Sequence, residues 1–279
     1  MSMSRKSGTK LLPSAVLSVG LLIAAASPSQ AGVIRISEAD FLAGSGLITF
    51  SEFAVNTVNP TFAPADYGGG AGSPTVTFDG FFTGQALSST PGADCPGAAA
   101  SACVVGGPTG PLSLDPASPD TFITTDASNP TSPVLSGTPL FNGPIAILFD
   151  TDLAGVGFDG GFFNAVGSTG ITAFGRDGSL LGTVANLTTG IEFLGLVTDD
   201  GLETIAGVFL DLVGAEPAGF AIDNLRFGAA SEVVGGTPPE PPIQPPSTPP
   251  TGVPEPATLA LMGVGLAGLG WARRRRKVS

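Results

Sequence analysis

Apolar residues alternate with small or polar residues in several short segments of the chain. The clearest segments are LITF with Ile48 and Phe50, PTVTF with Val76 and Phe78, PIAILF with Ile145, Ile147 and Phe149, and GITAF at 170–174. Gly, Pro, Asp or Asn stands at most of their boundaries, as is typical of strands that end in turns. Since successive side chains of a strand point to opposite faces, this alternation predicts strands with one buried face.

The second half of the chain predicts further strands joined by tight turns. Residues 171–187 contain a turn at Asp177-Gly178, residues 191–212 contain one near Asp200-Gly201, and Gly219–Gly228 forms a last strand. Many short strands at this spacing favour antiparallel sheets over a parallel one. We therefore predict an all-β fold, an antiparallel jelly-roll-like β-sandwich over residues 32–230, with segments 171–187 and 191–212 as a meander.

Two segments within this domain have weaker patterns. Residues 84–143 are rich in Gly, Pro, Ser, Ala and Thr, and they predict a long loop region that is either disordered or a functional surface. GVGFDG at 155–160 matches the glycine spacing of a dinucleotide-binding loop, but no helix pattern follows it. We expect a glycine-rich turn there.

Charge and composition exclude several functions. Between Gly32 and Pro256 the chain has 23 acidic residues and only Arg35, Arg176 and Arg226 as basic ones, so nucleic acid is not an expected partner. The absence of His excludes Ser-His-Asp triads and His-containing zinc sites. Carboxylate catalysis of the glycosidase type stays chemically open, but no spacing singles out an acid-base pair. We expect no enzymatic activity.

The N-terminus has the three parts of a signal peptide. Basic residues up to Lys10 precede the apolar run 11–26, and small residues lead to Ala31. We expect an N-terminal signal helix over residues 1–31 and cleavage by signal peptidase between Ala31 and Gly32. The alternative is a retained membrane anchor, which Pro13 and Gly20 within the apolar run disfavour.

The C-terminus predicts a linker and a short membrane anchor. Residues 231–256 form a proline-rich, extended linker. The uncharged residues 257–272, as a transmembrane helix at about 1.5 Å per residue, would span roughly 24 Å, slightly less than the ~30 Å hydrocarbon core. The basic cluster Arg273, Arg274, Arg275 and Arg276 places this end on the cytoplasmic side and the domain outside. Such a weak anchor suits a transient membrane stop.

The order of these C-terminal parts resembles the PEP-CTERM sorting signal of exported proteins of Gram-negative bacteria. Pro254, Glu255 and Pro256 stand directly before the apolar stretch and the basic tail, over residues 254–279. The resemblance implies that an exosortase-type membrane protease recognises this motif, and that the protein ends in the cell envelope, at the cell surface or outside the cell. It also implies an association with exopolysaccharide. The alternative is an ordinary single-pass anchor.

Export bears on the two cysteines, Cys95 and Cys103. An oxidising compartment favours a disulfide between them, although two free thiols stay an alternative. The C-x7-C spacing differs from the C-x-x-C of redox catalysts, so we expect the bond to be structural.

The last strand also carries a weak resemblance to carbohydrate-binding-like jelly-roll domains. GFAIDNLRF contains Asp223, and ITFSEF on the first strong strand contains Glu52. In such families, acidic residues on the first and last strands hold a structural Ca²⁺, and the resemblance implies this role for Glu52 and Asp223. Oxygen-rich composition suits a hard cation. The alternative is that Asp223 and Asn224 only form local strand-edge contacts.

Two functions therefore compete. The first is a non-catalytic envelope or extracellular-matrix protein, and the second is a calcium-stabilised carbohydrate-binding module with a defined sugar site. Sugar sites usually present exposed aromatic rings. Most aromatic residues here are Phe, which favour a core, and Tyr67 is the only tyrosine. In the doublets 81–82 and 162–163, neighbouring rings must point to opposite faces of a strand. We favour the first function.

Overall fold

The computed structural model describes residues 32–131 and 133–235. The signal segment up to Ala31, the Pro254–Pro256 motif, the predicted helix 257–272 and the cluster Arg273–Arg276 lie outside these residues. Within the described part of the chain, no helix is long and apolar enough to cross a membrane.

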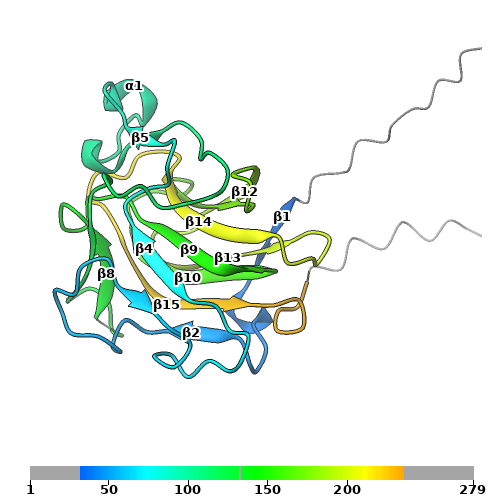
Figure 1. Ribbon diagram of the computed structural model, residues 1–279. Coiled ribbons are helices and arrows are strands. Elements are labelled where there is room, and N and C mark those ends of the chain that lie inside the picture. Colours follow the sequence, from blue (N-terminus) through cyan, green and yellow to red (C-terminus); the bar gives the residue numbers. More distant parts are fainter. Residues whose placement is uncertain (1–31, 132, 236–279) are drawn as a thin grey trace, which may run out of the picture.

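The described residues form an antiparallel β-sandwich, as predicted (Figure 1). One sheet has the order β1 (Val33–Ile36), β13 (Gly190–Thr198), β10 (Gly155–Phe163), β15 (Ala221–Gly228), β8 (Val134–Gly137) and β7 (Thr121–Thr124), with β2 (Gly46–Ile48) also paired to β15. The other has the order β12 (Leu180–Ala185), β11 (Thr169–Phe174), β14 (Ile205–Leu212), β9 (Ala146–Leu153), β4 (Val76–Asp79) and β3 (Thr61–Phe62). We call them the seven-stranded and the six-stranded sheet.

The segment 84–143 has more structure than its composition predicts. It contains the small sheet of β5 (Ala86–Leu87) and β6 (Val104–Val105), the helical turns α1 (Pro91–Asp94) and η2 (Ala100–Ala102), and the hairpin of β7 and β8. Ile123 and Leu135 from that hairpin are fully buried in the main core. A few well-placed apolar residues therefore suffice to hold strands within a glycine- and proline-rich segment.

The predicted meander is half right. β11 and β12 form a hairpin around Asp177-Gly178, where Gly178 has a φ of 82°. The turn after Thr198 is also present, but β13 and β14 lie in different sheets, so the expected hairpin over 191–212 is wrong. Turn residues specify a change of direction, and they do not specify whether the next strand pairs with the last or crosses to the opposite sheet.

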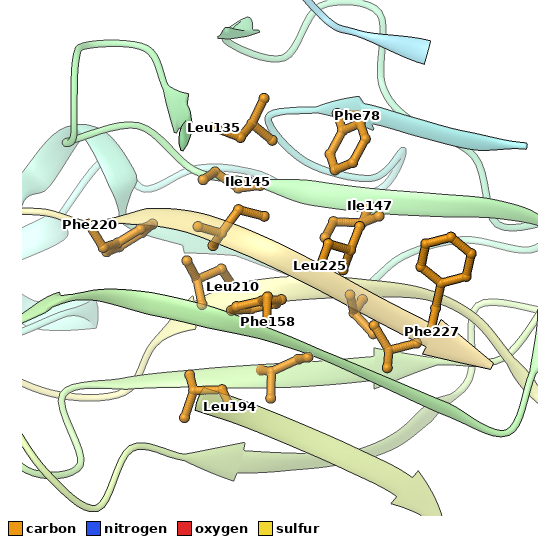
Figure 2. Close-up of a cluster of buried hydrophobic side chains, with 14 of the residues drawn as sticks. Phe78, Leu135, Ile145, Ile147, Phe158, Leu194, Leu210, Phe220, Leu225 and Phe227 are labelled. Atoms are coloured by element: carbon orange, nitrogen blue, oxygen red, sulfur yellow. The ribbon is translucent and has the colours of Figure 1, made fainter. Parts of the chain in front are cut away.

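The core lies between the two sheets (Figure 2). Its side chains come from both layers, for example Phe158 and Leu225 from the seven-stranded sheet and Ile147 and Leu210 from the six-stranded sheet. The apolar residues predicted to point inward in the segments LITF, PTVTF and PIAILF are all buried: Phe78 is 2% exposed, and each of the others is at most 1% exposed. Alternation therefore identifies the buried faces correctly.

Phenylalanine supplies a large part of this core. Phe50, Phe62 and Phe78 form a trio with ring centroids 5.6 to 5.9 Å apart in edge-to-face arrangements. Such pairs add about 0.5–1.5 kcal/mol each to the burial of the rings. The preference of the phenylalanines for the core is thus satisfied by specific ring packing.

A smaller apolar cluster lies on the outer face of the seven-stranded sheet. Ile36, Phe41, Val197 and Val233 are buried there, with Phe193 packed against them. Gly157 is essential to this packing, since a Cβ at that position would lie 2.5 Å from the Phe193 ring. The glycine-rich segment 155–160 lies within β10, so the expectation of a turn there is wrong.

The first and last described residues lie at the same end of the sandwich (Figure 1). The Gly32 amide donates a hydrogen bond to Asp199 Oδ1 at 2.9 Å, and the Val234 amide donates to the Asp40 carbonyl at 2.8 Å. We call this the terminal end. The opposite, distal end is where β10 finishes at Phe163 and β15 begins at Ala221.

Cys95 and Cys103 form the predicted disulfide. The bond closes the loop that contains η2, and both cysteines are buried in the main core. The Ala99 amide within this loop donates to the Glu216 carbonyl, which attaches the loop to the distal end.

Removal of this disulfide should destabilise the domain. In the chain-entropy model a loop of this length contributes about 2.5 kcal/mol, so Cys95→Ala/Cys103→Ala should lower the free energy of unfolding by about that amount. Denaturant titration of the variant and of the wild type gives the difference. Titration of the denatured, unreduced wild type should find no free thiol, and two free thiols would contradict the bond.

Candidate functional site

Two aspartates lie opposite each other on the outer face of the seven-stranded sheet. Asp159 of β10 pairs in register with Asp223 of β15. The neighbouring residues Phe158 and Ile222 point into the core, so both carboxyl groups point away from it. Two acidic side chains at one register position repel each other unless their environment compensates.

A β-bulge at Asn224 compensates part of this repulsion. Between the pairs Gly157–Arg226 and Asp159–Asp223, β15 has one more residue than β10. Asn224 adopts a φ of 46°, a left-handed conformation that asparagine tolerates better than most residues. Its Nδ2 donates to Asp159 Oδ2 at 2.8 Å, so the extra residue supplies a hydrogen-bond donor to the acidic pair.

The segment before β8 covers Asp223 from the other side. The Thr131 hydroxyl lies 2.6 Å from Asp223 Oδ2, and Asn129 Nδ2 donates to the same oxygen at 3.3 Å. Asp223 is 0% exposed as a result. The Asn224 amide donates to its other oxygen, Oδ1, at 2.7 Å. We call Asp159, Asp223, Asn224, Asn129 and Thr131 the polar cluster.

Burial, together with the nearby negative charge of Asp159, raises the pKa of Asp223 to about 6. Hydrogen bonds from Thr131, Asn224 and Asn129 act in the opposite direction but do not cancel the effect of burial. The geometry agrees with this direction. The single Thr131 hydroxyl proton cannot serve both Asp223 Oδ2 and Asn129 Oδ1, which lies 2.8 Å away, whereas a protonated Asp223 can donate to Thr131.

No positive charge neutralises the pair directly within the described residues. Arg226 is the nearest basic residue on β15, and its Nη2 lies 2.6 Å from Glu38 Oε1 in an ion pair. Burial and the charge of Glu38 raise the pKa of Asp159, while Arg226 and the Asn224 hydrogen bond lower it. The polar cluster is thus an acidic, oxygen-rich group of side chains beneath a loop.

The predicted calcium ligands occupy separate environments. β2 pairs with β15, as the resemblance implied. However, Glu52 lies beyond β2, where its Oε1 accepts hydrogen bonds from the Thr49 amide at 2.8 Å and the Thr49 hydroxyl at 3.0 Å. No hydrogen-bond partner among the described residues links Glu52 to Asp223. Within the same residues, no group of three or more His, Cys, Asp or Glu side chains is placed to hold a metal ion. Calcium stays a prediction.

Sequence reasoning found Asp223 and missed its partners. The signal for Asp159 was present, because reading Val156 and Phe158 as an inward alternation places Asp159 on the opposite face. Asn129 and Thr131 come from a loop far away in the sequence, and no local pattern marks them.

The aromatic candidates have different environments. Tyr67 packs edge-to-face on Phe227, its hydroxyl donates to the Pro74 carbonyl, and burial raises its pKa to about 12. Phe81 and Phe82 are both buried, whereas Phe163 is buried and Phe162 is 52% exposed. Tyr67 is therefore part of the packing, and Phe162 is the ring that faces solvent.

Comparison with protein-family models matches the C-terminal part of the chain. Residues 252–276 match the family described as the PEP-CTERM protein-sorting motif. This range contains Pro254, Glu255, Pro256 and the cluster Arg273–Arg276, and it confirms the sorting signal predicted from them. No curated protein matches the chain significantly.

The titration of Asp223 predicts how stability depends on pH. Because its pKa is higher in the folded state than the ordinary 3.8, this group stabilises the fold fully below about pH 4. That contribution is lost as the pH rises through about 6, by at most about 3 kcal/mol at about 1.4 kcal/mol per pKa unit.

Denaturant unfolding between pH 4 and 8 in EDTA measures this effect. Asp223→Asn removes the titration, so the difference between wild type and variant should change across this range. Asp200→Asn in the exposed turn after β13 is the control and should follow the wild type. A constant difference between wild type and Asp223→Asn would contradict the raised pKa.

Proposed function

We propose that this protein is an exported, non-catalytic protein of the cell envelope or extracellular matrix, associated with exopolysaccharide. Signal peptidase would remove residues up to Ala31, and an exosortase-type protease would act at Pro254–Glu255–Pro256. The sorting-motif match at 252–276 carries the proposal, because it supports export and exosortase targeting. The location in the envelope and the association with polysaccharide go beyond what this match supports, and they are part of the proposal.

The arrangement of the domain supports a role at the end of a tether. The described chain begins at Gly32, bonded to Asp199, and ends at Gly235, beside Gly201, so a tether that continues from Gly235 would start at the terminal end. The proline-rich linker predicts an extended chain, about 3.1 Å per residue in the polyproline conformation. We infer that the distal end is presented away from the membrane until the tail is cleaved.

The acidic pair does not have the properties that catalysis requires. Glycosidases place two carboxyl groups on either side of a substrate cleft that both can reach. Asp223 is fully buried beneath Thr131 and Asn129 and hydrogen-bonded to both, so a bound sugar has no access to it. This supports a non-catalytic role.

Intact mass spectrometry tests the processing. We expect the protein recovered from a host that carries the protease to start at Gly32 and to end within residues 254–256. A Glu255→Ala variant should keep Arg273–Arg276 and stay with the membrane, and a matched Glu240→Ala change in the linker should be processed normally. A wild-type mass that includes the basic tail would mean a permanently tethered domain.

A calcium-stabilised carbohydrate-binding module is the second candidate. It is favoured by Glu52, whose Oε2 is buried without a hydrogen-bond partner and could accept a cation. The sequence resemblance pairs it with Asp223, but the two side chains lie in separate environments, so this proposal rests on Glu52, and Ca²⁺ would supply structural stabilisation only.

A thermal-shift measurement decides whether calcium binds. Millimolar Ca²⁺ should raise the midpoint of the wild type by mass action, and Glu52→Ala should abolish the rise. Mg²⁺ at the same concentration is the control for ionic strength. An unchanged midpoint in the wild type would exclude the calcium site.

A further inference from the structure

The distal end of the sandwich contains a small hollow next to the exposed ring of Phe162. It has a volume of about 180 Å³ and lies where β10 ends and β15 begins. Among its lining residues are Phe162, Phe141, Gly161, Gly219, Asp126 and Ser128. The hollow therefore combines aromatic and backbone surfaces with a carboxylate and a hydroxyl, as ligand sites commonly do.

The exposure of Phe162 results from the strand geometry. The pairing of β10 with β13 shifts register between Gly160 and Phe163, and Phe163 then points into the core at 1% exposure. Phe162 consequently points outward at 52% exposure. Every other aromatic residue in 32–131 and 133–235 is buried or partly buried. Leaving a ring in water forgoes the stabilisation that burial gives nearly all the others.

The walls of the hollow are held in place by hydrogen bonds. Asn164, two residues after Phe162, accepts a bond from the Ala218 amide through its Oδ1 at 2.8 Å. The Asn164 amide donates to the buried Glu216 carboxyl group at 2.9 Å. On the other side, the Phe220 amide donates to the Phe141 carbonyl at 2.6 Å. The site is thus largely formed before any ligand arrives.

Gly219 is required for this arrangement. It adopts a φ of 79°, and a Cβ there would lie 1.6 Å from the Phe141 carbonyl oxygen. Glycine is the residue that fits this close approach with a positive φ. The wall beside the ring therefore consists of backbone, which leaves the hollow open.

The charges of the domain restrict the ligand. Asp126 is the charged residue that lines the hollow, and its Oδ1 accepts a hydrogen bond from the Ser128 amide at 2.8 Å. The described residues contain three arginines and no lysine or histidine. Each arginine is in an ion pair, with Glu192, Asp152 or Glu38. The excess of acidic residues would therefore repel a ligand rich in carboxylate or sulfate groups.

We propose that the hollow beside Phe162 binds a sugar unit of a neutral polysaccharide. The apolar face of the sugar ring stacks on Phe162, and hydroxyl groups donate to Asp126 and exchange hydrogen bonds with Ser128. Exposed Val166 and Leu187 lie in adjoining loops of the distal end, which the bond from the Gly167 amide to the Asn186 carbonyl joins. They extend the contact surface for neighbouring units. This inference rests on the proposed envelope location and names the ligand class.

Affinity electrophoresis of the full-length protein tests it. Native gels would contain dextran, hydroxyethylcellulose, the neutral polysaccharide fraction of the envelope of an exporting host, or anionic polygalacturonate. At least one neutral polysaccharide should retard the wild type, and polygalacturonate should not. Phe162→Ala should weaken the binding about tenfold or more, as loss of a stacked ring and its contact area does.

Matched variants distinguish binding at this hollow from binding elsewhere on the domain. Phe162→Trp keeps a ring and should retain binding. Leu202→Ala, at a residue that is 60% exposed in the turn at the terminal end, should bind like the wild type. No retardation by any neutral polysaccharide, equal retardation of Phe162→Ala and wild type, or binding only to polygalacturonate would each overturn the proposal.

Export is measured separately. Phe162→Ala should reach the same cell fraction with the same intact mass as the wild type. Normal processing with no polysaccharide binding would remove this inference and leave the proposed processing intact. Binding by a protein that is not processed would support the hollow and contradict the proposed route.

Discussion

Strand β15 is hydrogen-bonded to strands from three distant parts of the chain. It pairs with β10 over most of its length, with β2 near its C-terminal end and with β8 at Ile222. Since β15 is the last strand, the seven-stranded sheet cannot be completed until the whole domain is available. The same strand supplies Leu225 and Phe227 to the core, so sheet closure and core packing depend on one segment.

The bulge in β15 allows both requirements to be met. Without the extra residue at Asn224, strict alternation cannot place Ile222, Leu225 and Phe227 all on the inner face. The bulge restores the inner register and leaves Asp223 and Asn224 together on the outer face. The polar cluster and its raised pKa values are thus a consequence of how the last strand fits its neighbours.

Local patterns predicted most of the strands and failed where distant segments decide. Alternation identified the inward residues of β4 and β9, and Asp177-Gly178 identified the hairpin of β11 and β12. Whether β13 pairs with β14 depends on the partners available in each sheet, which the turn at Gly201 does not encode. Likewise, Asp223 was found, but Glu52 is bound to its own turn at Thr49, and the loop that buries Asp223 has no local signal.

The two ends of the sandwich differ in what their hydrogen bonds hold in place. At the terminal end, Asp199 and Asp40 accept backbone hydrogen bonds from Gly32 and Val234, so this end fixes both boundaries of the described chain. At the distal end, Glu216, Asn164 and the disulfide loop are hydrogen-bonded to one another and fix the segment that directly follows the exposed Phe162. The exposed ring thus stands next to backbone whose position is fixed by these bonds, which is the arrangement that the proposed sugar site requires. The ordered support at the distal end therefore favours a binding surface there.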